Sequence, residues 1–365
     1  MNGRMKKHRT PSTVKSRLMF LFIAILFALL CAEYVVAPIA LMCFGKPPRS
    51  LTLLGFYATP NTRVSDTVIN SQGFTGHVLH DTRPTKSTVR ILTLGGSSMF
   101  NRRMTMRLIE SLSKATATPL EIQGGALRTH TTRSSLIKYE QHFYQYDFDY
   151  VLIYHGINDL QMNHVAMEDF KEDYSHDLHW YKRNAVLDHS LIARLVFYTA
   201  VWKRPNEVRH GAEYSSSRSF ERNLRELVRL VRRDRGTPVL MTFSWHIPDD
   251  YTMERFVRNE LNYNNPTKYD MWPVELWGSV DYVREGLTRH NAIIRKLAND
   301  ENVLMIDQQE LMGDNIYYFG DPCHFSEEGT ALFIHNITEF FLSEELLTRR
   351  RTDAQTAQAP SRGES

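Results

Sequence analysis

The chain has 365 residues and a formal net charge of +3, with 42% hydrophobic and 23% charged residues, an ordinary globular composition with room for one large domain plus appendages. The first 17 residues contain six basic residues and no acid, so the positive excess belongs to an N-terminal tail and the rest of the chain is net negative. The body therefore lacks the basic stripe of a nucleic-acid-binding protein, and three cysteines (Cys31, Cys43 and Cys323) exclude a disulfide framework and a zinc ribbon.

The first expected element is an apolar segment at residues 18–44, which contains a single charge, Glu33. As a helix it would be about 40 Å long, more than the ~30 Å hydrocarbon core of a bilayer requires. We interpret it as a single-pass transmembrane signal anchor, with a cleaved signal peptide and a buried helix as the alternatives. The basic tail at 1–17 would then remain cytoplasmic, and the rest of the chain would lie in a periplasmic or lumenal space.

Residues 45–88 have the prolines and turn-forming residues of an irregular connector. From residue 89 the pattern alternates between short apolar runs and amphipathic stretches, which predicts a five-stranded parallel sheet covered by helices on both faces. The expected strands are 89–94, 120–122, 150–154, 239–243 and 303–306. The expected helices are 104–114, 132–143, 220–232, 280–298 and 326–347, with Thr131 or Thr132 capping the second and Ser326 preceding the acidic first turn of the last.

Residues 160–215 interrupt this alternation for longer than an ordinary connection and are rich in histidine, tyrosine and tryptophan. They form either a lid over a functional site or an additional helical layer, and the residues leave both interpretations open. His176 and His179 have no third ligand at a convincing spacing, so a metal site is not expected there. The polar tail at 348–365 is expected to be disordered.

Three polar motifs follow predicted strands. Leu94-Gly95-Gly96-Ser97-Ser98 ends the first strand, Gly156-Ile157-Asn158-Asp159 ends the third, and Asp321-Pro322-Cys323-His324 precedes the last helix. Open α/β sheets place their ligand sites at the carboxyl ends of parallel strands. A serine hydroxyl needs a nearby base, and an imidazole needs an orienting carboxylate. We therefore expect Ser97 as nucleophile, His324 as general base and Asp321 as its orienting partner, with Ser98 as the neighbouring alternative to Ser97.

In this order and context, the three motifs resemble the SGNH (GDSL-like) hydrolase family over residues 89–347. The resemblance implies a three-layer, flavodoxin-like α/β fold and an acyl-enzyme formed on Ser97. It also implies that the Asn158 amide donates to the oxyanion, and that neither a cofactor nor a metal is needed. Asp159 is expected to brace the loop rather than to contact substrate.

The chain departs from the family in the second motif, which usually reads Asn-x-Gly-x-x-Gly and supplies a backbone N–H to the oxyanion. Gly125 matches the earlier glycine, but the later one falls on Arg128. We expect Gly125 at the oxyanion site, although the resemblance leaves open which N–H donates. Arg128 and His130 are candidate substrate-binding residues; a position beside a helix cap is an equal interpretation for His130.

The resemblance implies a serine esterase or deacylase acting on an ester-bearing small molecule, glycan or lipid, such as an O-acyl group of a cell envelope. An O-acyltransferase with the same triad remains an alternative. A non-catalytic binding protein on the same scaffold is the other, and the Arg128 departure motivates it.

Overall fold

The computed structural model describes residues 11–36, 61, 63–64, 67–79, 88–100, 102–177, 208–266 and 271–347. The chain divides into two units, of which the first holds the N-terminal helix and the second holds the sheet and all the sequence motifs. The segment 178–207, which includes His179 and most of the predicted lid, and the predicted tail at 348–365 lie outside the described residues.

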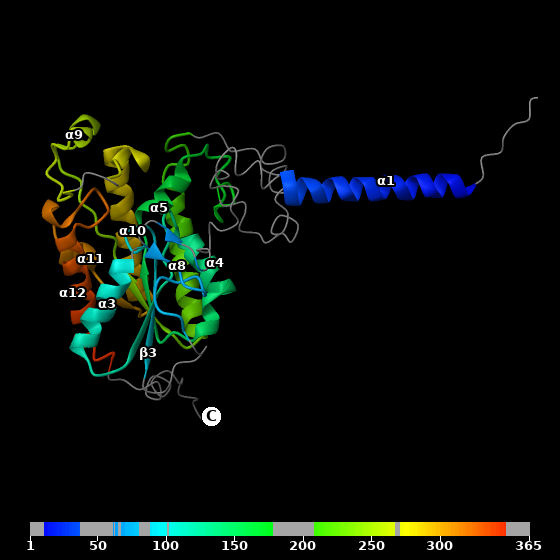
Figure 1. Ribbon diagram of the computed structural model, residues 1–365. Coiled ribbons are helices and arrows are strands. Elements are labelled where there is room, and N and C mark those ends of the chain that lie inside the picture. Colours follow the sequence, from blue (N-terminus) through cyan, green and yellow to red (C-terminus); the bar gives the residue numbers. More distant parts are fainter. Residues whose placement is uncertain are drawn as a thin grey trace, which may run out of the picture. The chain divides into compact units, whose positions relative to one another are not determined.

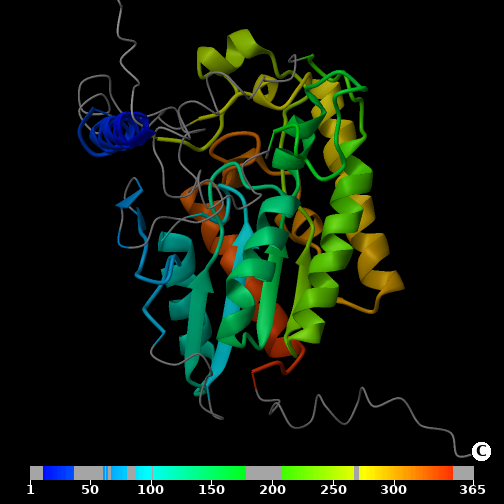
Figure 2. The same ribbon diagram turned by 90° about the vertical axis from the view of Figure 1, so that its right-hand side faces the viewer.

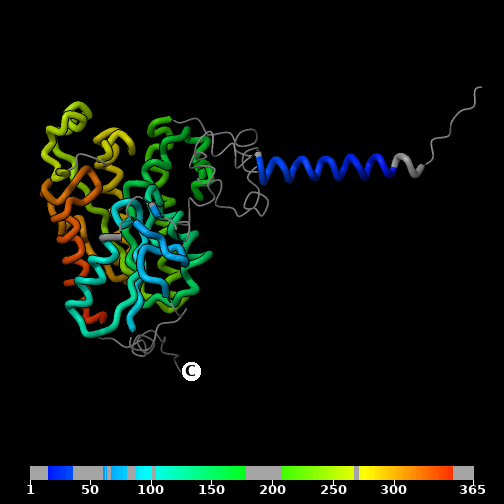
Figure 3. Tube along the Cα trace, viewed as in Figure 1, coloured from blue at the N-terminus to red at the C-terminus, as the bar shows by residue number. Residues whose placement is uncertain are grey.

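The first unit contains α1 (Pro11–Cys31), which continues as the π-helical η1 (Ala32–Val36), blue in Figures 1 and 3. Pro11 occupies the first helical position, where the missing N–H removes no hydrogen bond. The helix therefore begins inside the stretch predicted as a basic tail. Its segment Lys15–Val35 has a mean hydropathy of 2.5 and buries none of its length in the protein. It is long and apolar enough to cross a membrane, as an anchor or as a signal sequence.

The second unit is built on five parallel strands in the order β4-β3-β5-β6-β7. Their bounds are β3 (Val89–Gly95), β4 (Leu120–Gly124), β5 (Tyr150–Tyr154), β6 (Thr237–Met241) and β7 (Leu304–Ile306). This is the flavodoxin-like order, with the chain reversing its direction of travel across the sheet between β3 and β5. Gly95 pairs with Tyr154, so the ends of β3 and β5 lie side by side. The predicted five-stranded parallel sheet is confirmed.

Helices cover both faces of this sheet (Figures 1 and 2). Alternate residues of β5 point to opposite faces: Leu152 and Tyr154 join one apolar core, and Val151 and Ile153 join the other. The first core contains the inner faces of α3 (Arg102–Ala115) and α12 (Glu327–Ser343), and the second contains those of α4 (Thr132–Gln141) and α8 (Ser216–Arg233). α10 (Val280–Asp300) contributes to both cores. The three-layer arrangement is therefore confirmed.

Hydroxyl caps explain where three of these helices begin. Thr131 caps α4 by accepting from the Ser134 N–H, Ser279 caps α10, and Ser326 caps α12 by accepting from the Gly329 N–H at 3.0 Å. Of the two threonines expected at the start of α4, Thr131 is the cap. Thr132 is left to bond the motif at the end of β5.

The predicted connector at 45–88 is more ordered than expected wherever it is described. β1 (Arg63–Val64) and β2 (Thr67–Val68) pair antiparallel, and Thr75 exchanges two backbone hydrogen bonds of 2.9 Å with Gly124 at the end of β4. Phe74 is fully buried, with its ring centroid 4.7 Å from that of Phe143. This part of the connector thus belongs to the same body as the sheet.

Several short elements were not expected from the sequence, because each is shorter than two helical turns and has little periodicity. They are η4 (Phe143–Tyr146), α5 (Ile157–Leu160), η5 (Gln161–Asn163), α9 (Met253–Val257), η8 (Val274–Leu276), α11 (Gln308–Met312) and η9 (Ile316–Tyr318).

Candidate active site

The structure brings the three motifs together at the carboxyl end of the sheet. Ser97 lies in the turn that directly follows β3, and Asn158 lies in α5, two residues beyond the Gly156 that caps this short helix after β5. Asp321 and His324 lie in the loop between η9 and α12. β3 and β5 flank the point at which the strand order reverses, where flavodoxin-like sheets bind their ligands.

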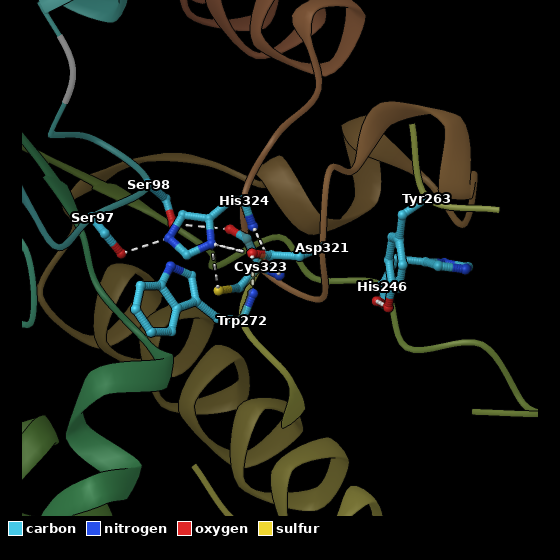
Figure 4. Close-up of polar contacts among 8 residues, drawn as sticks. All are labelled: Ser97, Ser98, His246, Tyr263, Trp272, Asp321, Cys323 and His324. Atoms are coloured by element: carbon cyan, nitrogen blue, oxygen red, sulfur yellow. Dashed lines mark hydrogen bonds and ion pairs between the residues drawn. The ribbon is translucent and has the colours of Figure 1, made fainter. Parts of the chain in front are cut away.

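Ser97, His324 and Asp321 form a continuous chain of hydrogen bonds (Figure 4). His324 Nε2 is 2.8 Å from Ser97 Oγ, and His324 Nδ1 is 2.7 Å from Asp321 Oδ2 and 2.9 Å from Oδ1. A carboxylate accepts but does not donate, so Nδ1 carries the proton and Nε2 is left to accept the Ser97 O–H. This is the tautomer that a general base for Ser97 needs.

The Asp321 carboxylate is held in place by backbone donors as well as by the imidazole. The N–H groups of Cys323 and His324 donate to Oδ1 at 2.9 and 2.8 Å, and the Trp272 N–H donates to Oδ2 at 3.1 Å. The residue is 1% exposed. Hydrogen bonds of this kind fix the orientation of the carboxylate toward the imidazole.

Ser98 and Cys323 link the serine turn to the histidine loop. Ser98 Oγ donates to the Cys323 carbonyl at 2.9 Å, so the hydroxyl that was the alternative nucleophile is directed away from His324 Nε2. Cys323 Sγ lies 3.5 Å from His324 Nδ1 and is fully buried, and burial raises the pKa of this thiol, which keeps it neutral.

Within the described part of the chain, one group of possible metal ligands was found: Asp321, Cys323 and His324, whose ligand atoms lie within 4.8 Å of one another. The carboxylate and imidazole of this group bond each other, and the thiol is neutral, so the arrangement serves the hydrogen-bonded triad. His176 is a buried structural residue, since Nε2 lies 2.9 Å from the Met162 carbonyl and Nδ1 accepts the Lys171 N–H at 3.1 Å.

The Asn158 side chain stands against the serine turn. Its Nδ2 donates to the His130 carbonyl at 3.1 Å, and a Cβ added to Gly96 would lie only 2.4 Å from that nitrogen. An asparagine NH₂ has two donors. With one N–H directed to His130, the second can serve an oxyanion formed next to Ser97.

The turn that carries Asn158 is braced from two helices. Asp159 is fully buried and accepts from the Thr132 N–H at 3.0 Å, the Thr132 hydroxyl at 2.6 Å and the Tyr174 hydroxyl at 3.0 Å. Burial raises the pKa of Asp159 to about 7, against the lowering effect of these hydrogen bonds. From α10, His290 Nδ1 donates to the Gly156 carbonyl at 3.1 Å, and burial lowers the pKa of His290 to about 4.

The expectation that Gly125 completes the oxyanion site is corrected by its hydrogen bonding. Its N–H donates to the Thr93 carbonyl at 2.8 Å, which continues the β3–β4 pairing by one residue. Its carbonyl accepts from the buried Lys138 ammonium, whose pKa burial lowers to about 7. A Cβ at Gly125 would contact Phe143, which belongs to the core on the α4 side of the sheet.

Arg128 and His130 lie further along the same loop. Arg128 is exposed, and Thr129 beside it has a φ of +63°, a strained value for a β-branched residue. The His130 side chain is 3% exposed, so the residue contributes to the site mainly through the carbonyl that holds Asn158. The structure therefore leaves Arg128 as the exposed candidate for substrate contact.

Sequence reasoning missed Trp272 and His290. Trp272 comes from the segment between β6 and α10, which has no motif and little periodicity. His290 lies in the middle of a well-predicted helix. The helical periodicity there can indicate that the residue is buried, but not that its side chain bonds the turn after β5.

No family model and no curated protein matches this chain. Among solved structures, it is similar to a GDSL-like lipase from Bacteroides thetaiotaomicron, at 12% identity over 72% of this chain and 91% of that chain, with a TM-score of 0.39. It is also similar to an acetylxylan esterase from Geobacillus stearothermophilus, at 14% identity over 70% of this chain and 96% of that chain, with a TM-score of 0.40. Because these identities and TM-scores are low, the functional proposal depends on the geometry of the site.

Proposed function

We propose that this protein is a serine esterase of the SGNH type, which hydrolyses a carboxylic ester through an acyl-enzyme on Ser97. The observation that supports this proposal most directly is the hydrogen-bond chain from Asp321 through His324 to Ser97 Oγ. Its two links have the order, the tautomer and the distances that nucleophilic catalysis by a serine requires.

In the proposed reaction, Ser97 Oγ attacks the ester carbonyl carbon while His324 Nε2 takes the hydroxyl proton. The carbonyl oxygen becomes an oxyanion and receives hydrogen bonds from the free N–H of the Asn158 amide and from the Ser97 backbone N–H. A single donor of this kind typically contributes about 2.7–4 kcal/mol to the transition state. His324 then protonates the departing alcohol oxygen, the C–O bond breaks, and a water activated by the same imidazole releases the acid and regenerates Ser97.

We further propose that α1 anchors the protein in a membrane with its N-terminus in the cytoplasm. The apolar segment Lys15–Val35 supports an anchor, and the six basic residues before residue 18 support this orientation. The catalytic unit would then face the periplasm or a lumen, where O-acylated glycans and lipids of the envelope are the available esters.

The test is hydrolysis of p-nitrophenyl esters, from acetate to octanoate, by the full-length chain in detergent micelles. The Ser97→Ala variant removes the nucleophile, and Ser343→Ala, at the exposed end of α12, is the matched control. We expect Ser97→Ala to lower kcat by about 10⁴-fold or more and the control to retain wild-type activity. Wild-type activity in a folded Ser97→Ala variant would refute the proposal.

A further inference from the structure

Trp272 is bonded to the triad through its backbone N–H, although it lies far in the sequence from all three motifs. Its N–H donates to Asp321 Oδ2 at 3.1 Å. Asp321 bonds the Nδ1 side of the His324 ring, whereas Ser97 bonds the Nε2 side. Trp272 is therefore fixed to the acid–base half of the site, while Asn158, held against Gly96, marks the oxyanion half.

The indole of Trp272 is open to solvent, whereas other large apolar side chains of the same segment are buried. Trp272 is 43% exposed, whereas Val274 and Trp277 in the same segment are 0% and 3% exposed. In Figure 4 the indole is drawn beside the imidazole of His324, on the side that faces Ser97. Among the described residues, none accepts a hydrogen bond from its Nε1. A rigid apolar plane with a polar edge is thus exposed on the residue whose backbone N–H bonds Asp321.

The acid–base half of the site is where the alcohol portion of an ester must lie. His324 Nε2 takes the proton of Ser97 and must deliver it to the departing alcohol oxygen, so this oxygen has to come within hydrogen-bond distance of Nε2. The carbonyl carbon of the ester carries three groups. With its carbonyl oxygen toward Asn158 and its alcohol oxygen toward His324, the acyl chain extends away from both. A side chain fixed to Asp321 consequently meets the alcohol portion before it meets the acyl chain.

We propose that Trp272 is a specificity-determining residue whose indole stacks on a ring in the alcohol portion of the substrate. A flat, rigid side chain with one long apolar face loses little conformational entropy when it covers another ring, and its Nε1–H can donate to a polar edge. The chemical class is therefore an ester of a ring-bearing alcohol, such as an acylated pyranose or an aryl ester. This inference rests on the proposed function and names the substrate class of the same site.

The test compares two ester series with the full-length chain in detergent micelles. In the first, the acyl group is always acetyl and the alcohol changes: ethyl acetate, phenyl acetate and glucose pentaacetate. In the second, the alcohol is always ethanol and the acyl chain lengthens from acetate to hexanoate. The enzymes are the wild type, Trp272→Ala, Trp272→Phe and the control Leu276→Ala, an exposed apolar residue of the same segment. All these substitutions keep the backbone N–H that bonds Asp321.

We expect Trp272→Ala to lower kcat/KM for the ring-bearing acetates about 10- to 100-fold more than for ethyl acetate, mainly through KM. Trp272→Phe should recover part of this selectivity, and Leu276→Ala should match the wild type. The acyl-chain preference should not change. The acetate whose kcat/KM falls more in Trp272→Ala, the aryl or the sugar ester, identifies the kind of ring on which the indole stacks.

Three results would overturn the inference. An equal loss for every ester, mainly in kcat, would show that Trp272 only positions Asp321. A changed acyl-chain preference would place the indole on the acyl side, and unchanged ratios would leave it without a role in specificity. Absence of Ser97-dependent hydrolysis by the wild type would instead refute the proposed function, and this inference with it.

Discussion

The Asp321 carboxylate joins its own loop to Trp272, which lies 49 residues earlier in the chain. It accepts from the Trp272 N–H, from two N–H groups of its own loop and from the His324 imidazole. Every one of these partners is a donor, so the site is complementary to an ionised carboxylate and to no other side chain of the same shape.

This complementarity predicts the behaviour of Asp321→Asn. The new NH₂ would face an N–H donor, and the imidazole would lose the acceptor that fixes its tautomer. We expect kcat for ester hydrolysis to fall about 10⁴-fold, with a far-ultraviolet circular dichroism spectrum like that of the wild type. Asp314→Asn, which changes a 93% exposed carboxylate bonded to His246, is the control and should keep full activity. Comparable activities for the two variants would contradict the assigned role.

Gly96 gives a second prediction at the scale of one atom. A Cβ at this position would lie 2.4 Å from Asn158 Nδ2, so Gly96→Ala must displace the amide from the serine turn. We expect kcat to fall about 10²- to 10³-fold, as for Asn158→Ala, with a small change in KM.

The double variant distinguishes this mechanism from general damage. If Gly96→Ala acts through the amide, adding it to Asn158→Ala should cost little further activity, because the same interaction is already lost. Additive losses in kcat would show that the alanine disturbs Ser97 by another route.

At the scale of elements, the turn after β5 depends on α10. His290 is fully buried, its ring is stacked on Phe220 at 4.1 Å, and its Nδ1 donates to the Gly156 carbonyl. No described residue bonds its Nε2. A second proton would therefore place an unpaired charge in the core, which is why burial lowers the pKa of His290 to about 4.

The direction of this shift predicts a loss of stability in acid. In the unfolded chain His290 binds a proton with the ordinary histidine pKa of 6.5, whereas the folded chain resists protonation until about pH 4. The contribution of His290 to the free energy of unfolding is thus fully present above pH 6.5. It is lost as the pH falls toward 4, by up to about 3 kcal/mol. His290→Asn keeps a donor for Gly156 but cannot titrate, so its unfolding free energy should be lower at pH 8 and flatter between pH 6.5 and 4. Urea unfolding across this range measures both, and parallel curves would contradict the explanation.

Prediction from the sequence succeeded where local chemistry decides the outcome. The run from Val89 to Leu94 is apolar enough to be a buried strand, and Ser326 with its acidic first turn marks the start of α12. It failed at Gly125, because whether that N–H pairs with Thr93 depends on how far two strands run together, which is a tertiary property. Trp272 had no local signal, since it bonds Asp321 through its backbone N–H, a group that every residue except proline has.

At the scale of the whole molecule, the strand order explains why residues that follow β3 and β5 lie together. In the order β4-β3-β5-β6-β7, the connections from β3 and β5 leave the sheet in opposite directions and open a space between their carboxyl ends. Ser97 and Asn158 stand at this point, and the loop before α12 delivers His324 to it. The α1 helix belongs to the other unit and contributes none of these residues.

The measurement that tests the central claim most directly is covalent labelling of the full-length chain by a fluorophosphonate, followed by mass spectrometry of its peptides. An activated serine is phosphonylated at its Oγ with loss of fluoride, whereas ordinary serines react negligibly. We predict one label on Ser97, no label on Ser97→Ala and a much slower reaction on His324→Ala. A label on Ser98, or none on the folded wild-type protein, would contradict the account.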